Sequence, residues 1–170
     1  MKIAILVCYN PTLLNFRLDM MLEMIRLGHQ VVAVGNESDA KWSKILQPFG
    51  IEYRFVKMQR NGLNPFRDFF SLVRLIRLLK KEKPDKIFTS QAKMVLYGGL
   101  AAFYLGIRDV YPLIAGLGSV FLSSGLKGRL LKRILLCGYR LSLRGSPSVC
   151  SIRWGVLPWA LRWCRSAESA

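Results

Sequence analysis

Short apolar runs alternate with longer amphipathic segments along most of the chain, and this alternation restricts the fold more than any other feature. The runs are short and continuously apolar, which is typical of strands that are covered on both faces. The predicted strands are residues 2–8, 30–34, 51–56, 86–89 and 109–114. Strands that alternate with helices form parallel sheets with right-handed crossovers. The sequence therefore predicts an α/β fold: a single Rossmann-like domain with a parallel sheet and helices on both faces.

Segments with helical spacing of apolar residues separate these strands and follow the last of them. The predicted helices are residues 15–27, 37–49, 66–83, 91–105 and 127–143. Gly28, Gly50 and Gly106 each follow one of these segments, at the position where a left-handed residue commonly ends a helix. Asn15 is a candidate cap for the first helix, because its side chain can accept a hydrogen bond from the first turn.

The sequence changes character near its carboxyl end. From residue 145 onward it holds three tryptophans, two prolines and two cysteines without a clear period. We therefore divide the chain into a Rossmann-like domain of residues 1–144 and an irregular tail of residues 145–170.

The chain is strongly basic. Its 170 residues carry a formal net charge of +16, and 52% of them are hydrophobic, which is sufficient for one domain with a real core. Like charges repel one another in a compact state, so such an excess favours an anionic partner. Nucleic acid, an anionic membrane surface and phosphorylated substrates all fit, and composition alone does not choose among them.

Several classes of site are disfavoured by what the sequence holds. Its four cysteines show no C-x-x-C spacing and it has one histidine, which argues against a structural metal site. Cys8 lies in the first apolar run and is expected to pack as a small hydrophobic residue in a reducing cytoplasm. No run reaches the roughly 18 to 20 apolar residues that cross a bilayer. Membrane contact would therefore be peripheral.

Ligands bind at the carboxyl ends of the strands in sheets of this kind, and three loops there hold candidate residues. Arg17 follows the first loop and could face a phosphate; the alternative is an ordinary surface arginine. Lys93 lies in the first turn of its predicted helix, where free N–H groups attract anions and a cation opposes the helix dipole. That cost suggests that Lys93 holds a diphosphate or a carboxylate, and a surface lysine is the alternative.

Two glycines form the third candidate. Gly116 and Gly118 follow the fifth predicted strand and permit close approach of the backbone to a ligand, although an ordinary turn would also use them. Acid–base groups are scarce. His29 lies at the opposite edge and is expected to be structural, whereas Asp19 could act as a base or merely stabilise a helix. The catalytic residues are unknown.

Basic residues gather on two amphipathic helices. In the predicted helix 127–143 they favour contact with an anionic membrane through Lys127, Arg129, Lys132, Arg133 and Arg140. In the predicted helix 66–83, packing on the sheet with solvated charges is at least as good an interpretation. Nucleic acid is not expected as a partner, because aromatic residues are not interleaved with the basic ones.

Several short stretches, in order, resemble the amino-terminal domain of family 4 glycosyltransferases. They are residues 14–17, 28–31, 61–65, 82–85, 90–93, 97–98 and 114–121. The most similar subgroup is bacterial enzymes that add a sugar to an undecaprenyl-diphosphate-linked sugar. The resemblance implies half of a GT-B fold, with Asn15, Arg17, Lys93 and the loop of Gly116 and Gly118 on the acceptor side of a cleft.

The resemblance also implies a metal-independent, retaining reaction with a nucleotide-sugar donor in the complete enzyme, and no other cofactor. The donor domain is expected to be missing from this truncated chain, which would then be inactive alone, because transfer needs both substrates held together. Two alternatives stay open: an acceptor subunit that needs a separate donor-binding chain, and a non-catalytic basic protein that binds membranes. The expected location is the cytoplasmic, inner face of the plasma membrane.

Overall fold

The computed structural model describes residues 1–58 and 65–113, with the side chains of residues 65–67 excepted. Five strands lie in this part of the chain: β1 (Lys2–Leu6), β2 (Gln30–Gly35), β3 (Glu52–Phe55), β4 (Lys86–Ser90) and β5 (Asp109–Leu113). The helices are α1 (Pro11–Phe16), α2 (Leu18–Arg26), α3 (Asp39–Leu46), the 3-10 turn η1 (Gln47–Phe49), α4 (Pro65–Glu82) and α5 (Ala92–Leu105).

The strands form one parallel sheet in the order β3-β2-β1-β4-β5. β1 is central, and Leu6 near its end lies opposite both Val34 of β2 and Thr89 of β4. The carboxyl ends of β1, β2 and β4 therefore meet at one edge of the sheet. The predicted α/β fold with a parallel sheet is confirmed.

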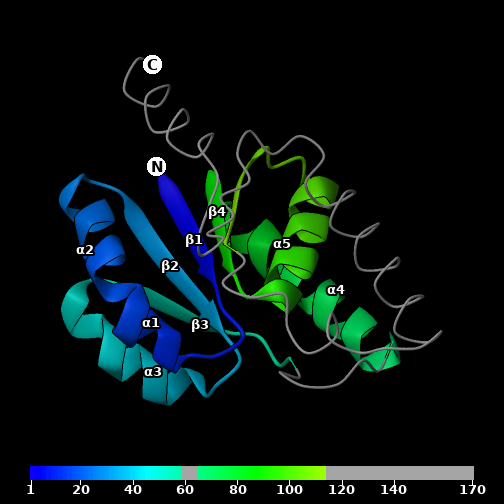
Figure 1. Ribbon diagram of the computed structural model, residues 1–170, viewed down its shortest axis with the longest axis horizontal. Helices are drawn as coiled ribbons and strands as arrows, with labels where there is room; N and C mark the ends of the chain where they lie inside the picture. Colours follow the sequence, from blue (N-terminus) through cyan, green and yellow to red (C-terminus); the bar gives the residue numbers. More distant parts are fainter. Residues whose placement is uncertain (59–64, 114–170) are drawn as a thin grey trace, which may run out of the picture.

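Two hydrophobic cores lie on the two faces of the sheet, because successive side chains of a strand point to opposite faces. In β1, Ile3 and Ile5 belong to the core beneath α1, α2 and α3, whereas Ala4 and Leu6 belong to the core beneath α4 and α5. Figure 1 shows these two helical layers, with α1 to α3 on one side of the strands and α4 and α5 on the other.

The first predicted helix is wrong in detail. The structure has two short helices, α1 and α2, which meet at Arg17, where φ is −126° and ψ is −12°. The helical segment begins at Pro11 rather than Asn15, because proline's fixed φ suits the first helical turn. Asn15 lies inside α1 and is exposed, so it does not cap the helix. The predicted terminations at Gly28, Gly50 and Gly106 are confirmed by φ values of 79°, 71° and 72°.

An ion-pair network lies at the amino-terminal edge of the sheet. Glu82, the last residue of α4, accepts hydrogen bonds from Lys2 Nζ at 2.6 Å and from Arg54 Nε at 2.7 Å. Burial raises the pKa of Glu82, but the bonds from Lys2 and Arg54 outweigh burial and leave the pKa below its ordinary value. Glu82 therefore joins α4 to β1 and β3 as an ionised carboxylate.

The predicted helix 127–143, the boundary at residue 144 and the tail lie outside the described residues. Among the helices that the structure does describe, none is long and apolar enough to span a bilayer.

Candidate functional site at the carboxyl edge of the sheet

Asn10 organises the loops after β1 and β2. Its side chain is fully buried; Nδ2 donates to Tyr53 Oη at 2.6 Å, and Oδ1 accepts from the backbone N–H of Asn36 at 3.1 Å. Tyr53 Oη in turn donates to the carbonyl of Glu37 at 2.8 Å. A Cβ at Gly35 would overlap the Asn10 side chain, so this packing requires glycine there. The two loops are thus fixed to each other and to β3.

Gln91 fixes the ends of three neighbouring strands. It follows β4, its Oε1 accepts from the backbone N–H of Cys8 at 2.6 Å, and its own N–H donates to the carbonyl of Leu113 at 3.2 Å. Its backbone has φ 78° and ψ 144°, a conformation that side-chain-bearing residues rarely adopt. Such strain persists only where surrounding contacts impose it, and here the two hydrogen bonds do so.

Arg17 lies over the middle of β4, on the face covered by α1 to α3. Its guanidinium carbon is 5.4 Å from the centroid of the Phe88 ring, and Nη1 donates to the carbonyl of Phe16 at 3.2 Å. Nε is buried and makes no hydrogen bond within the part of the chain that the structure describes. Burial lowers the pKa of Arg17. This half-buried cation keeps an Nε donor without a described partner, and no described carboxylate pairs with it.

Lys93 lies in the first turn of α5, on the opposite face of the sheet. Its Nζ is 2.8 Å from Asp68 Oδ1 of α4, and it lies 5.6 Å from the centroid of the Tyr97 ring. The two ionised side chains are 15% and 10% exposed. The sequence predicted that Lys93 holds a diphosphate or a carboxylate of a ligand, and this stays a prediction. Within the described residues its ammonium is paired with the carboxylate of Asp68. Asp68 therefore offsets the unfavourable position of Lys93 in the helix dipole.

Tyr97 completes this group. Burial raises its pKa, and the charge of Asp68 and a hydrogen bond to it raise the pKa further. Gly98 beside it allows α5 to approach the sheet closely, because a Cβ there would lie 2.5 Å from Thr89 Cγ2.

The structure places the described site residues apart. Arg17 lies over the middle of β4 on one face of the sheet, Lys93 lies just after β4 on the other face, and Asn15 is exposed on α1. His29 lies at the turn before β2, at the other edge, as expected. The remaining predicted residues lie outside the described part of the chain: Gly116, Gly118, Lys127, Arg129, Lys132, Arg133 and Arg140.

Three residues of the edge were not singled out by the sequence. Asn10 lies in a polar turn directly after the first strand, and Asp68 is an acid in the first turn of a basic helix; both were signals available in the sequence. The hydrogen bond from the N–H of Cys8 to the Gln91 side chain had no such signal in the sequence, because the two residues lie 83 positions apart.

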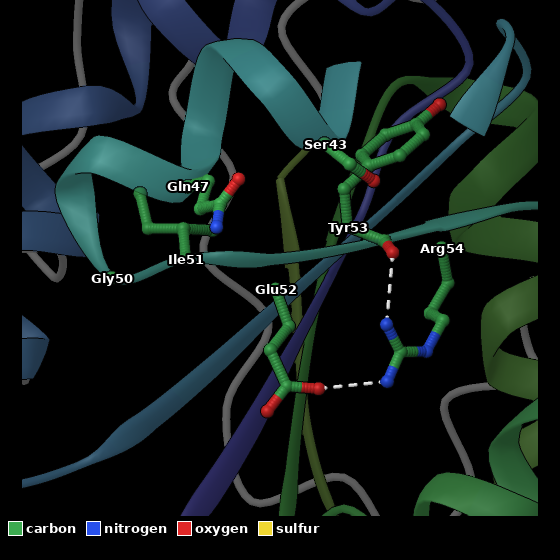
Figure 2. A pocket seen from close by; sticks show the side chains of 7 residues that line it. All are labelled: Ser43, Gln47, Gly50, Ile51, Glu52, Tyr53 and Arg54. Atoms are coloured by element: carbon green, nitrogen blue, oxygen red, sulfur yellow. Dashed lines mark hydrogen bonds and ion pairs between the residues drawn. The ribbon is translucent and has the colours of Figure 1, made fainter. Parts of the chain in front are cut away.

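A surface pocket lies apart from this edge. Figure 2 shows its lining, which comes from the end of α3, η1 and β3, with Arg54 bonded to Glu52 and to the carbonyl of Tyr53. The lining residues are Ser43, Gln47, Gly50, Ile51, Glu52, Tyr53 and Arg54. The cation in this pocket is already paired, so we do not assign a ligand to it. The described residues include no group of side chains suited to a metal ion.

The fold and its polar carboxyl edge define one half of a GT-B fold, the two-domain architecture of many glycosyltransferases. MurG of Acinetobacter baumannii superposes with a TM-score of 0.60 at 19% identity, over 92% of this chain and 43% of that one. A glycosyltransferase of Rickettsia africae superposes with a TM-score of 0.55 at 17% identity, over 98% of this chain and 49% of that one. The UDP-GlcNAc 2-epimerase of Methanocaldococcus jannaschii gives 0.52 at 19% identity, over 89% and 39%, so the fold alone does not specify transfer.

Sequence similarity narrows the class of protein further than the fold does. No family model matches the chain. Over 144 residues it is 24% identical to the N,N'-diacetylbacillosaminyl-diphospho-undecaprenol alpha-1,3-N-acetylgalactosaminyltransferase of Campylobacter jejuni, which covers 85% of this chain and 38% of that protein. The predicted resemblance to bacterial glycosyltransferases of undecaprenyl-diphosphate-linked sugars is thereby confirmed.

Proposed function

We propose that this chain is the acceptor-side half of a glycosyltransferase that acts on a polyprenyl-diphosphate-linked sugar. The similarity over 144 residues to the Campylobacter transferase carries the proposal. Because the chain spans 38% of that relative, the nucleotide-sugar donor would bind elsewhere, in a further domain or on a separate donor-binding chain. Transfer needs both substrates in one geometry, so we expect no turnover from this chain alone.

Arg17 is the cation best placed to hold the diphosphate. Its Nε has no partner among the described residues, and its guanidinium is half-buried over Phe88 of β4. Arginine presents several donors in a planar fork that matches phosphate oxygens. Lys93 would add a second charge from α5, and Asn15 would lie at the exposed rim. The loop of Gly116 and Gly118 remains a predicted part of the same site.

The outer face of α4 supports contact with an anionic membrane. Phe69 and Phe70 are 62% and 59% exposed, and their rings lie edge to face with centroids 6.1 Å apart. The buried face of the helix instead holds Ser71, Leu75 and Leu79. Four basic side chains are exposed along the same outer face: Arg74, Arg77, Lys80 and Lys81. Aromatic residues beside cations that pair with no described carboxylate suit a peripheral helix at a lipid surface, where each cation contributes about 1 kcal/mol.

The proposed location is thus the inner leaflet of the plasma membrane, where the predicted basic residues 127–140 would add to the contact. The same α4 face also favours a second candidate function, a non-catalytic protein that docks on anionic membranes. The two differ in whether a lipid-linked diphosphate sugar adds affinity beyond that of the lipid surface.

Binding to nanodiscs tests both. Discs of fixed anionic lipid content are prepared with an undecaprenyl-diphosphate-linked sugar, with undecaprenyl monophosphate, or with neither, and affinity is measured at several salt concentrations. We expect the diphosphate sugar to tighten binding about tenfold. Equal affinity for all three discs would contradict the proposal and favour the docking protein.

Two arginine variants sharpen this experiment, because they change the net charge equally. Arg17→Gln is expected to remove most of the gain from the diphosphate. Arg26→Gln removes an exposed arginine of α2 that is paired with Glu23 at 2.6 Å, and is expected to leave the gain intact. Turnover of a nucleotide sugar by the isolated chain would refute the division between acceptor and donor halves.

A further inference from the structure

The Lys93–Asp68 pair is unusually placed for a structural ion pair. It lies between the first turns of α4 and α5, next to the carboxyl end of β4, and both side chains are largely buried. Burying two charges costs desolvation free energy, and such pairs commonly stabilise a fold no better than apolar residues of similar size. If the only role of these two side chains were to pack α4 against α5, apolar residues would stabilise that contact equally well.

The pair is nevertheless reachable from solvent. The lysine side chain is 15% exposed and the aspartate side chain 10% exposed. The pair also lies at the helix end where backbone N–H groups attract anions. An anion that arrives at this end of α5 meets a carboxylate that already occupies its cation.

We propose that Asp68 is an internal counter-ion that occupies the Lys93 ammonium in place of a diphosphate and gives Lys93 up when a diphosphate binds. The identity of the ligand rests on the proposed function; the exchange itself concerns only these side chains. A diphosphate carries more negative charge than a carboxylate and offers more acceptor oxygens, so it competes for the ammonium where weaker anions do not.

Tyr97 makes the exchange possible. Its ring centroid lies 5.6 Å from Lys93 Nζ, and burial together with the charge of Asp68 raises the pKa of its hydroxyl. The hydroxyl is therefore the donor that would serve the carboxylate after Lys93 leaves. Without that donor, release of Lys93 would leave a buried carboxylate with an unmet need for hydrogen bonds, which is strongly unfavourable.

Titration of the chain with inorganic pyrophosphate by calorimetry tests the proposal. Asp68→Asn removes the competing charge and is expected to tighten binding on the order of tenfold. Glu23→Gln is the matched control: it adds the same charge and frees Arg26 on exposed α2, and is expected to change affinity less than about twofold. Equal or weaker binding by Asp68→Asn, or an equal gain in the control, would overturn the proposal.

The double variant Asp68→Asn/Lys93→Met shows whether the gain acts through Lys93. It leaves no unpaired charge between the helices, so it should fold, and it is expected to lose the whole gain. Tyr97→Phe provides a test that does not require loss of the pair: it should weaken pyrophosphate binding about fivefold, while Tyr104→Phe, at a residue 74% exposed, should not. Persistence of the gain in the double variant, or equal effects of the two tyrosine changes, would also overturn the proposal.

These outcomes are separable from failure of the proposed function. If the pyrophosphate results hold and nanodiscs with the lipid-linked diphosphate sugar do not bind, the counter-ion exchange stands and the lipid acceptor is wrong. If the nanodiscs bind and Asp68→Asn brings no gain with pyrophosphate, only the exchange is wrong.

Discussion

Asn10 and Tyr53 lie 43 residues apart in the sequence, yet their buried polar atoms are joined by a hydrogen bond of 2.6 Å. The bond connects the loop after the central strand β1 to the edge strand β3. Because Asn10 also accepts the N–H of Asn36, one side chain holds two loops of the candidate site in place.

Replacing Asn10 should therefore destabilise the fold. Asn10→Ala leaves the half-buried N–H of Asn36 and the buried hydroxyl of Tyr53 without their partner, and we expect a loss of about 1–3 kcal/mol in the free energy of unfolding. Tyr53→Phe should cost a similar amount, and the double variant less than the sum, because both changes remove the same bond. Urea denaturation measures all three. A strictly additive double variant would contradict the shared bond.

Gln91 offers a test of backbone strain. Gln91→Ala keeps a side chain at φ 78° and loses the bond to Cys8, so we expect a loss of about 1–3 kcal/mol. Gln91→Gly loses the same bond but relieves the strain, and should be clearly more stable than the alanine variant. The thermal unfolding midpoints of the two variants measure this difference. An alanine variant at least as stable as the glycine variant would show that the backbone at residue 91 is not strained.

Most of the fold could be predicted from the sequence because its signals are local. The β-branched run of residues 30–34 and the glycines at the helix ends act through their own backbone preferences. The parallel direction of the strands follows from the alternation of strands and helices. The break at Arg17 could not be predicted, because the apolar spacing continues through it.

The candidate site was less predictable, because its geometry depends on contacts distant in sequence. The position of Lys93 suggested an anionic ligand, whereas the partner that the structure describes is Asp68 on a different helix. No local pattern indicates that a side chain from α4 reaches α5. Arg17 was a candidate because of its place after the first loop. Its burial over Phe88 could not be predicted, because that contact depends on the pairing of β1 with β4.

The Glu82 network predicts a specific loss of stability in acid. Its pKa lies below the ordinary value of 4.5, so the carboxylate stabilises the fold at higher pH, and that contribution disappears as the pH falls through the lowered pKa. Glu82→Gln should be less stable at pH 7 by about 1–3 kcal/mol.

The same variant should lose less additional stability than the wild type between pH 5 and pH 3. Chemical denaturation at each pH measures the difference. Glu23→Gln, which changes a carboxylate on the exposed surface of α2, serves as the control for the general effect of charge. Parallel pH profiles for wild type and Glu82→Gln would show that the network does not control the acid transition.

Arg17 should show a conflict between stability and binding. Arg17→Met removes a half-buried cation with an unmet donor and keeps apolar contact with Phe88, so the free energy of unfolding should stay the same or rise by up to about 1 kcal/mol. Binding of the lipid-linked diphosphate sugar should nevertheless fall. Arg74→Met, on the exposed face of α4, should change stability by less than about 0.5 kcal/mol. A marked loss of stability in Arg17→Met would indicate a structural role.

The strand order has a consequence for synthesis on the ribosome. Residues 1–58 supply β1, β2 and β3 with the helices of only one face. Until α4, β4 and α5 have emerged, Leu6, Val32 and Val34 lack the helices that cover them. The nascent chain thus passes through a stage in which one apolar face of the sheet is exposed to water. Aggregation with other nascent chains and the need for a chaperone are expected to be greatest at that stage.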